Sequence, residues 1–313
     1  MKNILLVGAS GFIGSNVLEF LYKKNEFNLT TLSRKKLLNN NFKKTNNIYI
    51  DDFLSYQEWE KIMKKIDVLI IAIGAVHNKY NSSIYMDKVN YFLPKLLTKH
   101  AIANKIKKII FISSCSVYKE NTNYTEPINE SMVTYPETGY GISKLKAENE
   151  LIKICKNQTE LIIVRPPLVY GNNIFDNFKK VQNLVSLGFY LPTKLFNAKR
   201  SFIYIKNLSY FIYLCITYTK INGLYLISDD DDISFSKMVS TINKAMNQKD
   251  RQFKLNLKII SFLTKIIFMN KKFRKVSKYF IIDISKAKEK MGYVPIYNFD
   301  TAINDIYTNN KLL

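Results

Sequence analysis

The chain reads Gly8-Ala9-Ser10-Gly11-Phe12-Ile13-Gly14 between a short apolar run, Ile4–Val7, and a helical pattern, Ile13–Lys23. Glycines at this spacing permit a tight turn and let the backbone approach a pyrophosphate, which then rests on the helix N-terminus. The spacing alone is common, but its place between a strand and a helix makes it informative. The stretch therefore predicts a dinucleotide-binding strand–turn–helix unit.

Short β-branched runs alternate with helical patterns through the first half of the chain. Such alternation is typical of a parallel sheet with helices on both faces. After Arg165-Pro166-Pro167 the pattern becomes less regular. The predicted strands are 4–7, 28–32, 67–73, 108–113, 160–165 and 201–205, and the predicted helices are 13–23, 58–65, 88–103, 140–156, 177–187 and 234–246.

We therefore expect an α/β protein with a doubly wound parallel Rossmann sheet and a smaller C-terminal α/β domain that binds the substrate. Residues 1–165 would form the NAD(P)-binding domain and residues 166–313 the substrate-binding domain. A segment near 201–225 is expected to return to the first domain.

The composition excludes several classes of protein. Hydrophobic residues make up 47 % of the 313 positions, which excludes a disordered chain. The cysteines (Cys115, Cys155 and Cys215) lie far apart without a CxxC pair, and there are two histidines, so we expect neither a disulfide framework nor a metal site. The longest apolar run, Val68–Val76, is far shorter than the ~20 residues of a membrane-spanning helix, so we expect a cytoplasmic protein.

A formal net charge of +22 allows two interpretations. A basic protein attracts anions such as nucleotides, nucleic acids or acidic membranes. The basic residues are spread along the chain, however, which favours a general compositional bias. No nucleic-acid-binding module is recognisable, so nucleic acid is not an expected partner.

The second predicted strand ends at Ser33, followed by Arg34 and Lys35. An NAD-binding site usually carries an acidic residue here, which hydrogen-bonds the adenosine ribose. A hydroxyl beside two cations suits a 2′-phosphate instead, since arginine can bind it with paired hydrogen bonds. We expect NADP(H) as the cofactor, with NAD(H) as the alternative. A solvated basic cluster would also explain these residues.

Tyr140 and Lys144 stand at i and i+4 of a predicted helix, on one face. A nearby cation favours the phenolate and would lower the tyrosine pKa, which makes the phenol a usable proton donor or acceptor. Ser114, at the end of the strand predicted at 108–113, can polarise a substrate carbonyl. A surface pair would be the simpler interpretation of this motif if it stood without the glycine turn.

The chain resembles the extended short-chain dehydrogenase/reductases, also called the NAD-dependent epimerase/dehydratase family, over nearly its whole length. By that resemblance Ser114, Tyr140 and Lys144 would be the catalytic residues. Tyr140 would exchange a proton with the C4 oxygen of a nucleotide-activated sugar while hydride passes between C4 and the nicotinamide. Asp52 and Phe53 would hold the adenine, Ile73 and Gly74 would line the cofactor cleft, and Asn90 would belong to the same site. The matching segments are 8–14, 52–53, Asn90, 112–118, 140–144, 165–171 and 200–207.

The 4,6-dehydratases of this family carry an Asp-Glu pair where this chain has Cys115 and Ser116. Because that pair drives elimination of water, a dehydratase is disfavoured. The resemblance points to a reductase of UDP-4-keto-6-deoxy-N-acetylhexosamines, used for surface polysaccharides such as the lipopolysaccharide O-antigen. A UDP-hexose or UDP-N-acetylhexosamine 4-epimerase with tightly bound NAD is the alternative. A non-catalytic NADP-binding regulator is a third reading, which the presence of all three catalytic residues disfavours.

The resemblance also implies substrate contacts in addition to Ser114. Asn177 and Arg200 would contact the UDP diphosphate, and His77 would lie near the sugar, although an ordinary loop histidine also fits. Lys119 and Lys206 stand where many relatives have Gly and Asp. Many relatives form homodimers, and nothing in this sequence decides that question.

The stretch Lys254–Lys278 holds eight basic residues and no acidic one, interleaved with large apolar residues. One interpretation is weak association with an anionic membrane surface. The other is a helix whose apolar face packs on the substrate domain while its lysines are solvated.

Overall fold

A computed structural model describes residues 1–35, 37, 42–75, 82–119, 124–172, 183, 185–186, 197–253 and 278–309. Its centre is a seven-stranded sheet in the order β10-β6-β5-β4-β1-β2-β3, and every neighbouring pair is parallel. The expected doubly wound parallel sheet is confirmed. Its strands are β1 (Lys2–Val7), β2 (Phe27–Ser33), β3 (Asn46–Tyr49), β4 (Val68–Ile71), β5 (Lys108–Ile112), β6 (Glu160–Arg165) and β10 (Gly223–Leu226).

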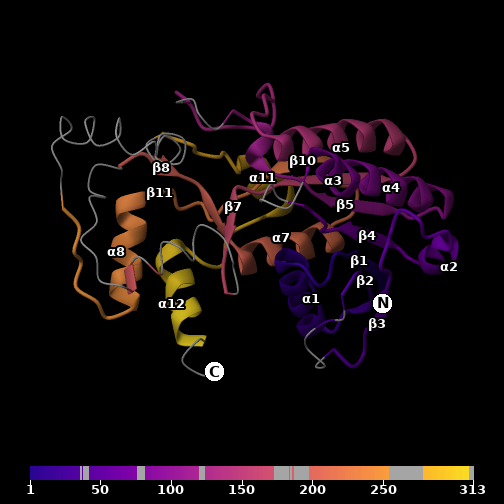
Figure 1. The fold of residues 1–313 in the computed structure, drawn as a ribbon, viewed down its shortest axis with the longest axis horizontal. Helices are drawn as coiled ribbons and strands as arrows, with labels where there is room; N and C mark the ends of the chain where they lie inside the picture. Colours follow the sequence, from indigo (N-terminus) through magenta and orange to yellow (C-terminus); the bar gives the residue numbers. More distant parts are fainter. Residues whose placement is uncertain are drawn as a thin grey trace.

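Both faces of the sheet are buried, because side chains alternate along each strand. In β1, Ile4 and Leu6 belong to one hydrophobic core, whereas Leu5 and Val7 belong to the other. Helices α1 (Phe12–Lys24) and α7 (Ile205–Thr217) cover the first face, and α4 (Leu93–Ala103) and α5 (Gly139–Cys155) cover the second (Figure 1). Shorter helical segments connect them: α2 (Trp59–Met63), α3 (Ser83–Asp87), the π-helix η1 (Lys88–Phe92) and the 3₁₀ turn η2 (Cys115–Val117).

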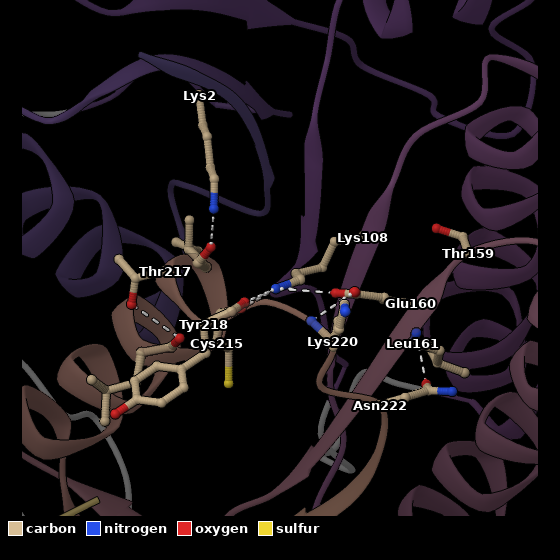
Figure 2. A network of polar contacts seen from close by, with 12 residues as sticks. Lys2, Lys108, Thr159, Glu160, Leu161, Cys215, Thr217, Tyr218, Lys220 and Asn222 are labelled. Carbon is tan, nitrogen blue, oxygen red and sulfur yellow. Dashed lines mark hydrogen bonds and ion pairs between the residues drawn. The ribbon is translucent and has the colours of Figure 1, made fainter. Parts of the chain in front are cut away.

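The segment that forms α7 and β10 joins the seven-stranded sheet, although it comes late in the sequence. The C-terminal carbonyls of α7 accept hydrogen bonds from two lysines at the amino-terminal edge of the sheet. Lys2 Nζ donates to Ile216 O at 2.7 Å, and Lys108 Nζ donates to Cys215 O at 2.9 Å and to Tyr218 O at 2.5 Å (Figure 2). Cations at this position donate hydrogen bonds to the last carbonyls of the helix and interact favourably with the negative end of its dipole.

The remaining elements lie beside the carboxyl edge of the sheet (Figure 1). In the described part of the chain they comprise two small sheets and three helices, and the rings of Tyr170, Tyr204 and Phe299 pack together among them. The boundaries of the two domains stay a prediction. The elements are β7 (Leu168–Tyr170), β8 (Lys199–Arg200), β9 (Phe202–Tyr204), β11 (Ile233–Ser234), α8 (Phe235–Ala245), α11 (Ser285–Met291) and α12 (Phe299–Asn309).

Sequence patterns located most elements of the first half, but not those with weak or mixed patterns. Strand β3 was not expected, because only four residues pair with β2. The predicted strand 201–205 is shorter in the structure, because β9 covers only Phe202–Tyr204 and Ile205 already begins α7. The helix expected at 177–187 and nearly all of Lys254–Lys278 lie outside the described residues. No helix in the described part of the chain is long and apolar enough to cross a membrane.

Candidate active site

The expected catalytic and cofactor-binding residues lie at the carboxyl edge of the sheet, where β1 and β4 are neighbours although β2 and β3 lie between them in sequence. Chain connections leave in opposite directions from such a switch point, and a crevice forms above it. Ala72 N donates to Val7 O at 2.9 Å, and Gly8 N donates to Leu32 O at 2.8 Å. The glycine turn, the end of β2 and the end of β4 are thereby held together.

The glycine turn packs so tightly that no side chain fits at Gly8 or Gly14. Gly8 has a φ of +94°, and a Cβ there would lie 2.7 Å from Ala72 O. A Cβ on Gly14 would lie 2.1 Å from Gly8 O. Gly11 is the N-cap of α1 and, within the described residues, no side chain caps this helix, so its first N–H groups can receive an anion. The turn formed by Gly8, Gly11, Phe12, Ile13 and Gly14 therefore fits a dinucleotide pyrophosphate.

At the end of β2 the Arg34 guanidinium stands next to Ser33, whose hydroxyl already donates a hydrogen bond to the backbone. Ser33 is buried, and its Oγ donates to Lys35 O at 2.7 Å. Arg34 is exposed, and its Nη1 donates to the phenol oxygen of Tyr85 in α3 at 2.8 Å. The Arg34 guanidinium is therefore accessible to a phosphate group from the solvent, whereas the Ser33 hydroxyl stabilises the local backbone.

The predicted adenine residues follow β3. Asp52 is exposed, and its Oδ1 accepts from Leu54 N at 3.0 Å. Phe53 is buried against Trp59, with ring centroids 6.5 Å apart. Their contact with adenine stays a prediction.

Helix α5 carries Tyr140 and Lys144, and its start is specified locally. Thr138 is the N-cap, with its hydroxyl accepting from Gly141 N at 3.1 Å. Gly141 allows α5 to approach the turn η2, because a Cβ there would lie 2.1 Å from Ser116 O. This close approach brings Tyr140 near Ser114, whose hydroxyl partly opposes the rise in the Tyr140 pKa that burial causes. Ser114 also accepts from Ser116 N at 3.1 Å.

Lys144 is buried, and its Nζ donates to Ile73 O at 3.1 Å and to Ile112 O at 2.8 Å. It lies 4.7 Å from the centroid of the Phe111 ring and 6.0 Å from that of Tyr140. These contacts link α5 to the ends of β4 and β5. Burial lowers the pKa of Lys144 to about 7, and the Glu148 carboxylate partly opposes this shift.

The pKa of Tyr140 differs from the sequence-based expectation. In the protein chain itself burial raises it to about 12, and the hydrogen bond with Ser114 opposes this only in part. The expected lowering by Lys144 is therefore wrong for the chain alone. Desolvation penalises the phenolate, and Lys144 does not compensate, because with a pKa of about 7 its amine is already neutral in the range where Tyr140 titrates. Tyr140 is thus a protonated donor near neutral pH.

Asn90 holds the backbone at the end of β4 against α5 through side-chain hydrogen bonds. It is fully buried in η1, and its Oδ1 accepts from Ala75 N at 2.7 Å. Its Nδ2 donates to Ala75 O at 2.9 Å and to Ser143 Oγ at 3.0 Å. Asn90 therefore fixes the strand end that carries Ile73 and Gly74 against α5. Binding of the cofactor by these three residues stays a prediction.

Sequence reasoning missed the polar network beneath the catalytic residues. Ser113, Glu148 and Arg165 are buried and joined by hydrogen bonds, and Arg165 Nη1 donates to Tyr118 OH at 2.6 Å. The signal was available in part, because Glu148 stands one helical turn after Lys144. The contacts of Arg165 and Ser113 with Glu148 could not be predicted, because they depend on the register of β5 and β6 in the sheet.

The predicted sugar-nucleotide residues are not brought together by the described structure. His77 and Asn177 lie outside the described residues. Arg200 stacks on Phe280 at 4.8 Å and donates to Lys278 O at 3.2 Å, so its diphosphate contact stays a prediction. Lys206 forms an ion pair with Asp305 at 2.6 Å.

The positions that distinguish dehydratases carry no carboxylate. Cys115 is buried, and its Sγ donates to Arg165 O at 3.1 Å, so this side chain faces the core. Its neighbour Ser116 follows in η2. Among the described residues no group of His, Cys, Asp and Glu side chains could hold a metal ion.

A model of the NAD dependent epimerase/dehydratase family matches residues 4–227. The chain belongs to this family. Among curated members of the NAD dependent epimerase/dehydratase type, it is 29 % identical to the UDP-glucose 4-epimerase of Vibrio cholerae over 304 residues, which is 94 % of this chain and 91 % of the relative. It is 25 % identical to the N-acetyl-alpha-D-glucosaminyl-diphospho-ditrans,octacis-undecaprenol 4-epimerase of Escherichia coli O157:H7, over 79 % of this chain and 73 % of that one.

The same family fold is seen in the crystal structure of UDP-N-acetylglucosamine 4-epimerase from Bacillus cereus. The two structures superpose with a TM-score of 0.79 and cover 100 % and 98 % of the respective chains, at 22 % identity. At that identity the likeness shows the fold.

Proposed function

We propose that this protein is a UDP-sugar 4-epimerase that oxidises and re-reduces C4 of its substrate with a tightly held NAD. The observation that carries the proposal is the meeting of Ser114, Tyr140 and Lys144 at the switch point of the sheet, beside the glycine turn. Similarity to the UDP-glucose 4-epimerase along 94 % of the chain supports this choice over the reductase that the sequence motifs favoured.

The residues of the chain have distinct parts in this reaction. Ser114 would hydrogen-bond the C4 oxygen, and Tyr140 would exchange a proton with it, since the Ser114 hydroxyl lies close enough to the phenol to affect its pKa. Lys144 would hold the ribose side of the site through a nitrogen anchored on Ile73 and Ile112. When bound, the nicotinamide supplies the hydride acceptor and donor. The lack of a carboxylate at Cys115 and Ser116 argues against elimination of water.

The nucleotide released by the denatured protein tests the proposal. We expect near-stoichiometric NAD, and interconversion of UDP-glucose with UDP-galactose, or of their N-acetyl forms, without added cofactor. Tyr140→Phe should abolish this interconversion and leave the bound NAD in place, because it removes the exchanging proton alone. A variant that still turns over the substrate would contradict the assigned role.

A second candidate, the NADPH-dependent reductase of a UDP-4-keto-6-deoxy-N-acetylhexosamine, is favoured by one observation. The exposed Arg34 guanidinium stands at the ribose end of the site without an acidic residue at 33–35. Such an end suits a 2′-phosphate and an exchangeable NADPH. A protein that holds no nucleotide but oxidises NADPH with the keto sugar would establish this candidate. Arg34→Asp should then shift preference toward NADH, and an unchanged preference would exclude a role for Arg34.

A further inference from the structure

A buried ion pair lies behind the proposed catalytic residues. Glu148 and Arg165 have side chains that are 1 % and 6 % exposed, and their closest N···O distance is 2.5 Å. Glu148 Oε1 also accepts from Arg165 Nε at 3.0 Å and from Ser113 Oγ. Neither residue of this ion pair lies in the glycine turn, and neither is one of the proposed catalytic residues.

The ion pair joins the three elements that carry the site: α5, the turn after β5 and the end of β6. Ser113 is bound by Glu148, and Cys115 is bound by the backbone next to Arg165, with Cys115 N donating to Pro166 O at 2.9 Å. Both neighbours of Ser114 are therefore held, one by the Glu148 carboxylate and the other by the backbone that follows Arg165.

A contribution to the free energy of unfolding does not explain why Glu148 and Arg165 form a buried ion pair. Replacing a buried ion pair with apolar residues of similar volume is often neutral or stabilising, because desolvation of two charges is expensive. A more specific reason comes from Lys144, one helical turn before Glu148. The groups that hydrogen-bond or contact its nitrogen in the described part of the chain are uncharged: two backbone carbonyls and the rings of Phe111 and Tyr140. Glu148 is the carboxylate that opposes the lowering of the Lys144 pKa by burial.

We propose that Glu148, held in place by Arg165, is a positioning residue for Ser114 and the counter-charge of Lys144. This inference rests on the proposed function, in which those two residues are catalytic. Arg165 neutralises part of the Glu148 charge, and Tyr118 is the further titratable group that contacts the pair, through Arg165. The effect of Glu148 on Lys144 is therefore expected at the low end of the range for a neighbouring opposite charge.

Titration of Lys144 tests the counter-charge without any substrate. The chain is labelled with ¹³C-lysine, the Lys144 signal is assigned with Lys144→Met, and its pKa is measured by NMR. Glu148→Gln should lower that pKa by about one unit. Glu150→Gln is the matched control on the same helix, because Glu150 pairs with Lys95 at the protein surface, and it should leave the Lys144 pKa unchanged. Equal pKa values in the two variants would overturn the inference.

Turnover tests the positioning. A lysine that acts as a cation loses its effect as pH rises through its pKa. The alkaline limb of the kcat profile should therefore move to lower pH in Glu148→Gln and not in Glu150→Gln. Ser113→Ala keeps the ion pair but frees the turn, so kcat should fall about tenfold or more while KM and the Lys144 pKa stay near wild type.

The two proposals can fail separately. If no nucleotide sugar is turned over, the proposed function fails, and the NMR titration still decides whether Glu148 is the counter-charge. If Glu148→Gln does not fold, Ser113→Ala and Glu148→Asp decide: wild-type kcat in both would overturn the positioning role, and a selective loss of kcat with normal Lys144 titration would support it.

Discussion

Gly141 is the residue at which packing and catalysis are most directly linked. It follows Tyr140 in the first turn of α5, where a Cβ would lie 2.1 Å from the backbone oxygen of Ser116. Contacts below 3.0 Å are essentially never seen for real Cβ atoms, so Gly141→Ala must separate α5 from η2 by about 0.9 Å. The atom struck belongs to the backbone and cannot rotate away.

The substitution has opposing effects on stability. Overpacking of this kind typically costs about 1–3 kcal/mol, whereas alanine in place of glycine within a helix contributes up to about 1 kcal/mol. We therefore expect a modest net decrease in the free energy of unfolding. The effect on turnover should be larger, because a displacement near 1 Å between Ser114 and Tyr140 costs on the order of 100-fold in rate. That loss corresponds to about 2.7 kcal/mol in activation free energy.

Gly139→Ala is the matched control. It lies two residues earlier on the same helix, and among the described residues its Cβ would meet only the flexible end of Met86, at 3.1 Å. Urea unfolding and steady-state interconversion of UDP-sugars should be measured for both variants. We expect kcat to fall in Gly141→Ala and to stay near wild type in Gly139→Ala. Equal kcat values would refute the argument that the close approach of α5 to η2 sets the catalytic geometry.

Two further predictions concern buried lysines. Because the pKa of Lys144 is lowered from 10.5 to about 7, the folded state binds fewer protons than the unfolded state between these values, and stability rises with pH. The free energy of unfolding of wild type relative to Lys144→Met should thus grow by on the order of 1 kcal/mol per unit between about pH 7 and pH 9 in urea titrations, and a constant difference would contradict the shift. Lys108→Met should cost about 2–3 kcal/mol and leave kcat unchanged, since it uncaps α7 at the edge of the sheet opposite the site. The exposed neighbour Lys107, changed in the same way, should cost under about 1 kcal/mol, and an equal loss would show that the α7 contacts are not responsible.

Local patterns predicted the first half of the fold well, for physical reasons that act over a few residues. Within the turn itself Gly8 O excludes a Cβ at Gly14, and the apolar runs at 108–113 and 160–165 are buried on both faces of the sheet. The pair Tyr140 and Lys144 was found because an i, i+4 spacing aligns side chains on any helix.

Long-range contacts explain what the sequence did not reveal. The C-terminal end of α7 is capped by Lys2 and Lys108, which lie more than a hundred residues away in the sequence from the carbonyls they bind. The Tyr140 pKa was expected in the wrong direction, because spacing reports that a lysine is near but not that both groups are desolvated.

The sequence by itself determined the parallel sheet, the glycine turn and the identity of Ser114, Tyr140 and Lys144 as candidates, because each depends on local periodicity or on a short motif. The tertiary structure alone decided that Glu148, Arg165 and Ser113 form one buried network, because they come from three elements that meet only through sheet register. It also decided the charge of the site, since burial is a property of the whole fold.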